Sequence, residues 1–137
     1  MPYLIDTDLV IDHLANIPEA NQLLDKLAPE GIAISIITYM EVYQGVARSP
    51  SATEARAKLQ IFRRSVPVLP FSLSVAKRCA LLREQLKTEQ KRVKARALDL
   101  INAAIALEHD LTLVTRNVRD YQDIPGLHLY PLAARML

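Results

Sequence analysis

The sequence has few of the residues that mark several common protein classes. It contains no tryptophan, three glycines and a single cysteine, Cys79, in 137 residues. One cysteine cannot form an internal disulfide, which suits a reducing compartment, so we expect a cytoplasmic protein. Three glycines argue against a glycine-rich phosphate-binding loop. Aromatic residues make up only 5% of the chain, so base stacking is not expected to dominate any contact with nucleic acid.

Long apolar runs and a strong net charge are also missing. No stretch approaches the roughly 18 apolar residues of a membrane-spanning helix, so we expect no membrane partner. The formal net charge of +2 does not by itself indicate a nucleic-acid partner. Hydrophobic residues account for 50% of the chain, and this length fits one hydrophobic core. We therefore predict that residues 1–137 form a single domain.

Short apolar runs alternate with stretches of helical periodicity along the chain. Strands that alternate with helices require crossover connections and favour a parallel sheet covered on both faces. We predict a three-layer α/β domain with a mainly parallel sheet of four or five strands flanked by helices. Two prolines around the third strand place it near a sheet edge. The predicted strands lie at residues 3–5, 32–36, within 66–71, at 111–114 and within 124–130.

Four carboxylates stand beside these buried elements, at what would be the same edge of the sheet. Asp6 follows the first strand, Glu41 lies in a helix predicted to begin at Thr38, Asp99 lies early in a later helix, and Asp120 follows the next strand. Converging carboxylates cannot all stay ionised unless a cation offsets their charge. Because the ligands would be oxygens only, the ion would be Mg²⁺, with Mn²⁺ as a substitute.

Each of these acids also has a structural interpretation. Asp6 or Asp8 would cap the following helix, Thr38 and Glu41 match a capping box, Asp99 would favour the positive end of its helix, and Asp120 would be a solvated turn residue. The segment from Asp6 to Asp8 also resembles the nucleophile motif of haloacid-dehalogenase-type phosphatases, although that family's later motifs are not evident. Four other acids have the pattern of ordinary surface residues: Asp12, Asp25, Asp110 and Asp123.

The only strong charge run is the basic tract at residues 87–96, which ends the preceding helix and leads into Asp99. Such a tract is either a solvated helix end or a set of phosphate contacts beside the proposed metal, and the sequence supports both interpretations. Arg116 adds a cation at the same edge of the sheet. The candidate RNA-binding residues are Lys91, Arg92, Lys94, Arg96 and Arg116.

Three segments together resemble the PIN-domain ribonucleases, and specifically the VapC-type toxins of bacterial toxin–antitoxin modules. They are LIDTDLVIDHL at the start, ISIITYMEVYQGV in the first third and ALDLINAAIALEHDLTLVTRNVRDYQDIPGL near the end. The resemblance covers nearly the whole chain. It implies a Mg²⁺-dependent endoribonuclease toxin that hydrolyses RNA phosphodiester bonds by attack of metal-activated water, leaving a 3′-hydroxyl and a 5′-phosphate.

The resemblance also assigns roles to individual residues. Asp6 and Asp99 match the principal metal ligands, and Glu41 and Asp120 match the further acids that complete a catalytic pocket. Two polar positions that line the pocket are Thr115 and Asn117.

Partners and departures from the family pattern follow from the same resemblance. It implies a cognate VapB-like antitoxin, whose C-terminal segment would cover the active-site groove, and a toxin homodimer.

Two residues depart from the family pattern. Asp8 stands where many relatives have Asn, and Asn102 stands where a small apolar residue is more usual, one helical turn from Asp99. Asp8 would bind a second metal or cap a helix, and Asn102 would hydrogen-bond a ligand or its neighbours. The alternative function is a catalytically silent PIN-like module that binds RNA or a protein without cleavage.

Overall fold

A parallel sheet of short strands lies at the centre of the computed structural model, which describes residues 2–137. The strand order is β3-β2-β1-β4, and each neighbouring pair is parallel. Leu4 is aligned with Ala33 in β2 and with Leu113 in β4, so all the carboxyl ends lie at one edge. The strands are β1 (Tyr3–Ile5), β2 (Ile32–Ser35), β3 (Val68–Leu69) and β4 (Thr112–Val114). As predicted from its prolines, β3 is an edge strand.

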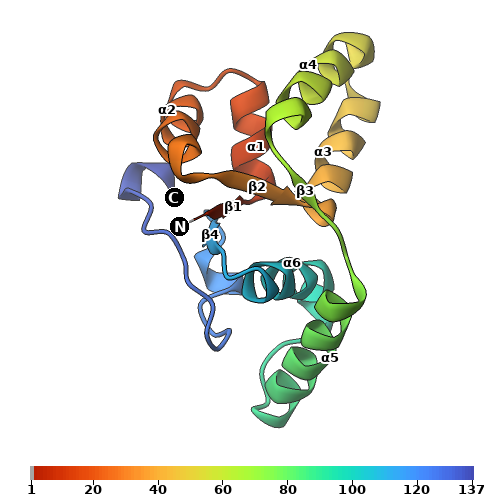
Figure 1. The fold of residues 1–137 in the computed structure, drawn as a ribbon, viewed down its shortest axis with the longest axis vertical. Helices are drawn as coiled ribbons and strands as arrows, with labels where there is room; N and C mark the ends of the chain where they lie inside the picture. The colour runs from red at the N-terminus through yellow and green to blue at the C-terminus, as the bar shows by residue number, and fades with distance from the viewer. Residues whose placement is uncertain (1) are drawn as a thin grey trace.

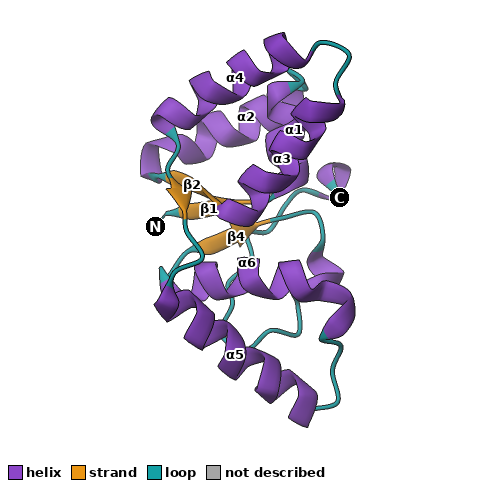
Figure 2. Cartoon of the chain, turned by 90° about the vertical axis from the view of Figure 1, so that its right-hand side faces the viewer, coloured by secondary structure: helices purple, strands orange, loops and turns teal. Residues whose placement is uncertain are grey.

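Helices cover both faces of the sheet, which confirms the predicted three-layer α/β arrangement. Helices lie above and below the sheet in Figure 1, and the side view in Figure 2 shows the same layers. The upper helices are α1 (Thr7–Leu14), α2 (Pro18–Leu27), α3 (Ile36–Arg48) and α4 (Ala52–Ser65). The lower pair is α5 (Leu73–Thr88) and α6 (Ala97–Glu108). No helix in residues 2–137 is long and apolar enough to cross a membrane.

Two hydrophobic cores form because successive strand side chains point to opposite faces. Leu4 and Leu113 pack into the core between the sheet and the helices α5 and α6. Ile5 and Val114 pack into the core between the sheet and the upper helices. All four are fully buried. Burying one such side chain stabilises the fold by about 1.5–3 kcal/mol. The interiors of the central strands are therefore apolar, and polar side chains are found where these strands end.

Helix caps follow directly from the residues at these strand ends. Asp6 caps α1 by accepting a hydrogen bond from Thr7 N, and Ser35 caps α3 by accepting one from Thr38 N. The capping role predicted for Asp6 is thus present. The capping box predicted at Thr38 is wrong, because α3 begins two residues earlier and Thr38 lies inside its first turn.

Two other predicted boundaries differ from the structure. The helix expected to run to the end of the basic tract stops at Thr88, and residues 94–96 form a separate 3-10 turn. The strand expected within 124–130 is reduced to one parallel bridge between Leu113 and Leu129, flanked by the hydrogen bonds Leu113 N to His128 O and Tyr130 N to Leu113 O.

Candidate active site

The sheet reverses its direction of growth between β1 and β4, and the candidate site lies at this point. From β1 the chain adds β2 and β3 on one side, and β4 then lies on the other side of β1. Ligands in open parallel sheets bind beside the carboxyl ends of the strands at such a switch point. Asp6 directly follows β1, and Thr115 directly follows β4. Their side chains meet, since Thr115 Oγ1 donates to Asp6 Oδ2 at 2.6 Å.

A pocket of about 540 Å³ opens over this point. Its walls come from the start of α1, one face of α3, the first turn of α6 and the loop after β4. Six of the residues singled out from the sequence line it: Asp6, Asp8, Glu41, Asp99, Arg116 and Asn117. Its other polar lining residues are Thr7, Gln44 and Arg48. The fold thus brings together acids that lie 93 positions apart in the chain.

Asp6 lies deepest among these acids. Its carboxylate accepts hydrogen bonds from Thr7 N at 2.9 Å and Thr115 Oγ1 at 2.6 Å, and Asn102 Nδ2 lies 3.5 Å away. Burial raises the pKa of Asp6, and the negative charges of Asp8 and Glu41 raise it further, while the hydrogen bonds oppose the shift. The ionised form of Asp6 therefore lacks full compensation by the protein.

Asp99 lies in the first turn of α6 and lines the same pocket as Asp6. Burial raises the pKa of Asp99 as well, with further contributions from Asp120 and Asp6. The Tyr121 hydroxyl donates to Asp99 Oδ1 at 3.1 Å. Tyr121 is itself 1% exposed, and burial between these acids raises its pKa, so its phenol stays neutral and can donate.

Asn102 lies one helical turn after Asp99 and is 2% exposed. Its Nδ2 donates to Tyr121 Oη at 3.3 Å, and its Oδ1 has no hydrogen-bond partner within residues 2–137. A buried acceptor without a partner costs roughly 1–3 kcal/mol. Of the two roles predicted for Asn102, the hydrogen bonds to neighbouring residues are present, to Asp6 and Tyr121, and the contact with a ligand stays a prediction.

Glu41 reaches the pocket from the second turn of α3. Thr7 Oγ1 donates to Glu41 Oε1 at 2.6 Å, and Thr38 Oγ1 lies 3.2 Å from the same hydroxyl. This contact ties α3 to α1 beside Asp6. Glu41, Gln44 and Arg48 follow at intervals of three and four residues, so they share one helix face. That spacing was available in the sequence, and Arg48 and Gln44 could have been identified from it.

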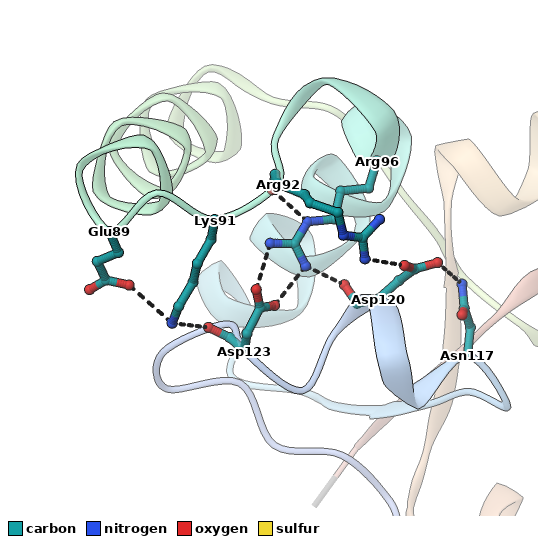
Figure 3. A network of polar contacts seen from close by, with 7 residues as sticks. All are labelled: Glu89, Lys91, Arg92, Arg96, Asn117, Asp120 and Asp123. Carbon is teal, nitrogen blue, oxygen red and sulfur yellow. Dashed lines mark hydrogen bonds and ion pairs between the residues drawn. The ribbon is translucent and has the colours of Figure 1, made fainter.

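Asp120 differs from the other predicted acids because cations and amides already surround it. Arg92 donates to its Oδ1 and Asn117 donates to its Oδ2, each at 2.7 Å (Figure 3). The hydrogen bond from Arg92 is the main cause of the lowered pKa of Asp120. Asp120 does not line the pocket, although its charge is felt by Asp99. Its place is the rim of the site.

Arg96 does not lie where a phosphate contact requires. Its side chain is 1% exposed, and its guanidinium forms a bidentate pair with Asp123 at 2.6 and 2.8 Å (Figure 3). It also donates to the carbonyl oxygens of Arg92 and Asp120. The predicted RNA contact of Arg96 is therefore wrong, and so is the description of Asp123 as an ordinary surface acid. Their pair fastens the basic tract to the loop after β4.

The other predicted cations have different surroundings. Lys91 pairs with Glu89 at 3.1 Å, and Lys94 is exposed. Arg116 lines the pocket, but its guanidinium binds Asp12 Oδ2 and Met136 O, each at 2.7 Å. Asp12 is thus a partner of Arg116 and not a solitary surface acid. Arg48 is an exposed pocket-lining cation that the sequence argument missed.

The donor set of the pocket fits a hard divalent cation. Every candidate ligand is a carboxylate oxygen, and burial disfavours the charge on both Asp6 and Asp99. Within residues 2–137, no three His, Cys, Asp or Glu side chains converge into a complete protein-only metal site. Mg²⁺ does not require one, because it keeps several waters and is usually bound by one or two carboxylates. The residues that would hold it are Asp6 and Asp99.

The fold and pocket together define a parallel α/β protein with an acid-lined site at the switch point of its sheet. The chain belongs to the PIN domain family, whose match spans residues 3–127, and it is homologous over its full length to the VapC ribonuclease toxins of VapBC systems. This confirms the family suggested by the three sequence segments.

Individual relatives support the same assignment. The chain is 32% identical over 133 residues to ribonuclease VapC2 of Rickettsia felis, covering 94% of this chain and 96% of that protein. It is 26% identical over 129 residues to the tRNA(fMet)-specific endonuclease VapC of Salmonella typhimurium, covering 94% and 96%. Among solved structures, VapBC2 from Rickettsia felis bound to a promoter DNA fragment matches with a TM-score of 0.84 and 27% identity, covering 97% of this chain and 100% of that one.

Proposed function

We propose that this protein is a Mg²⁺-dependent endoribonuclease toxin of a type II toxin–antitoxin system. The observation that carries the proposal is the pocket itself, which gathers Asp6, Glu41 and Asp99 from three separate elements. Burial leaves Asp6 and Asp99 with raised pKa values, so a cation between them would relieve an unfavourable charge. Relatives named as ribonucleases and endonucleases support this choice of reaction.

The chain's own residues would act as follows. Asp6 and Asp99 hold the ion, while Thr115 and Thr7 fix the orientation of Asp6 through their hydrogen bonds. The chemistry supplied by Mg²⁺ in this position would be Lewis-acid polarisation of a phosphoryl oxygen and activation of the attacking water. Glu41, whose Oε1 accepts a hydrogen bond from Thr7 Oγ1, would take up a proton from the attacking water. Asp8 is exposed and lines the pocket, where its carboxylate would add to the negative charge that favours a cation.

Phosphate contacts are proposed for the exposed cations around the pocket. Arg48 lines the pocket, and Lys94 is exposed on the basic tract. Arg92 and Lys91 would have to leave their acidic partners to reach RNA, which costs little at the surface. Such contacts bind the backbone without reading the sequence.

An antitoxin partner is proposed from the surface next to the pocket. An apolar groove of about 440 Å³ runs between α1, α3 and α4 and shares Ile11 and Arg48 with the pocket. A VapB-like C-terminal segment lying in this groove would end over the acids. Complexes named VapBC and FitAcB among the similar structures support such a partner. The homodimer implied by the family resemblance stays a prediction, to be checked by sedimentation of the purified protein.

The decisive experiment incubates purified, antitoxin-free protein with total bacterial RNA, with and without Mg²⁺. Asp6→Asn and Asp99→Asn should remove cleavage, whereas Asp25→Asn, an exposed acid on α2 outside the pocket, should cleave like the parent protein. Cleavage that survives chelation, or survives both pocket substitutions, would contradict the proposal. A folded protein that binds RNA and never cleaves it would establish the catalytically silent module instead.

A further inference from the structure

Two buried side chains connect the carboxylates proposed to hold the metal. Tyr121 Oη donates to Asp99 Oδ1 at 3.1 Å and accepts from Asn102 Nδ2 at 3.3 Å. The same amide nitrogen lies 3.5 Å from Asp6 Oδ1. This series of hydrogen bonds has enough donors, because the amide nitrogen carries two hydrogens and the phenol carries one. A continuous polar bridge therefore runs from Asp6 through Asn102 and Tyr121 to Asp99.

The fold alone gives no reason for an amide at position 102. Asn102 is 2% exposed, its helix neighbours Ala103 to Ile105 are fully buried, and its Oδ1 has no partner within residues 2–137. An apolar side chain of similar shape would remove that unsatisfied acceptor and would be at least as compatible with the core. Residues that break the rules of core packing in this way are expected mainly at functional sites. Of the two groups that Asn102 bonds, Asp6 lines the pocket, and Tyr121 in turn donates to the pocket acid Asp99.

The phenol at position 121 follows the same logic. The ring of Tyr121 packs in the core beneath α5 and α6, and phenylalanine would fill the same space. Only the hydroxyl reaches Asp99, and it enters a region where two carboxylates already repel each other. A neutral donor there fixes the carboxylate without cancelling the charge that would attract a cation.

We propose that Tyr121 and Asn102 are positioning residues that orient the Asp6 and Asp99 carboxylates for metal binding. This inference rests on the proposed function, because it takes Asp6 and Asp99 as the metal ligands. Neither residue contacts the RNA. Each holds one oxygen of a ligand carboxylate, so the two acids are set in place before the ion arrives. Hydrogen-bond partners of metal ligands act in this way, and their loss typically lowers metal affinity about 10- to 100-fold.

The test measures Mn²⁺ binding by electron paramagnetic resonance on the full chain, beside urea unfolding of the metal-free protein. The variants are Tyr121→Phe, which deletes one hydroxyl, and Asn102→Leu, which keeps the branched shape of the side chain and deletes the amide. The matched control is Tyr3→Phe, since Tyr3 Oη also donates to a carboxylate, that of Glu30, at 2.9 Å, but lies at the opposite end of β1.

Both pocket variants should bind Mn²⁺ about 10- to 100-fold more weakly, while Tyr3→Phe binds like the parent protein. Asn102→Leu should still unfold cooperatively in urea, so that its weaker Mn²⁺ binding is not a consequence of unfolding. RNA cleavage by Tyr121→Phe should need more Mn²⁺ for half-maximal rate while approaching the parent's maximal rate.

Parent-like Mn²⁺ affinity in Tyr121→Phe would overturn the inference and leave the proposed function intact. Absence of Mn²⁺ binding by the parent protein would overturn the metal assignment itself, and with it the inference. If Asn102→Leu does not fold, the structural role is favoured for Asn102, and Tyr121→Phe decides the positioning role alone.

Discussion

Replacing Arg96 by methionine should destabilise the fold strongly, although Arg96 belongs to a tract that has the pattern of a solvated surface. The guanidinium makes four hydrogen bonds, two of them to Asp123, and the side chain is 1% exposed. Methionine keeps the apolar stem and removes the charged head. The fall in stability of Arg96→Met therefore measures the contribution of the polar contacts.

The expected magnitude follows from burial on the two sides of the pair. Breaking a buried ion pair by removing one partner costs about 3–5 kcal/mol. Asp123 is 29% exposed and can regain some water, so the cost should fall near the lower end, about 3 kcal/mol. For a domain of this size, that corresponds to a fall in Tm of roughly 10 °C.

Arg92→Met is the matched control. Arg92 lies in the same tract and pairs with Asp120 in the same loop at 2.7 Å, but its side chain is 49% exposed. An exposed pair contributes only about 0–1 kcal/mol. Urea unfolding at neutral pH compares the two variants directly. If both substitutions destabilise the protein by less than about 1 kcal/mol, Arg96 does not fasten the tract to the loop, and the reasoning from burial is refuted.

Three further predictions concern the titrating groups. The stability advantage of the parent protein over Arg96→Met should hold above about pH 4 and shrink as pH falls through the lowered pKa of Asp123, which urea unfolding across pH would show. Metal-free Asp6→Asn should be as stable as the parent at neutral pH or more so, because burial raises the pKa of Asp6 and asparagine caps equally well; a loss of about 1 kcal/mol in urea unfolding would contradict this. The difference in unfolding free energy between Asp6→Asn and the parent protein should vanish at acid pH, where Asp6 is protonated. Thr115→Val should weaken Mn²⁺ binding about 10-fold or more in a direct titration by removing the 2.6 Å donor to Asp6, and parent-like affinity would exclude that role.

The fold could be predicted from the sequence because its signals are local. The apolar run at Tyr3–Ile5 and the proline-initiated helix at Pro18–Leu27 have the same bounds in the structure. The bounds of the final strand could not be predicted in this way, because its pairing depends on the backbone groups of Leu113 in β4, which is distant in sequence. Position along the chain also predicted that the acids would gather at one edge, since parallel strands end together.

The surroundings of each side chain could not be predicted, because they depend on residues distant in sequence. Arg96 has the same local sequence pattern as its exposed neighbours. Its burial becomes apparent only in the structure, where Asp123 from the loop after β4 pairs with it. Asp120 was grouped with the pocket acids, yet Arg92 holds it at the rim. Tyr121 carried no signal beyond its place next to Asp120.

The structure separates its acids into two electrostatic classes. At the rim, Asp120 and Asp123 have lowered pKa values because arginines pair with them. In the pocket, Asp6 and Asp99 have raised pKa values, and the side chains that donate to them, Thr115 and Tyr121 among them, are neutral. Neutral donors orient a carboxylate but leave its charge in place. We therefore expect a cation from solvent to bind in the pocket rather than at the rim, and this difference in charge compensation separates the proposed ligands from the other acids nearby.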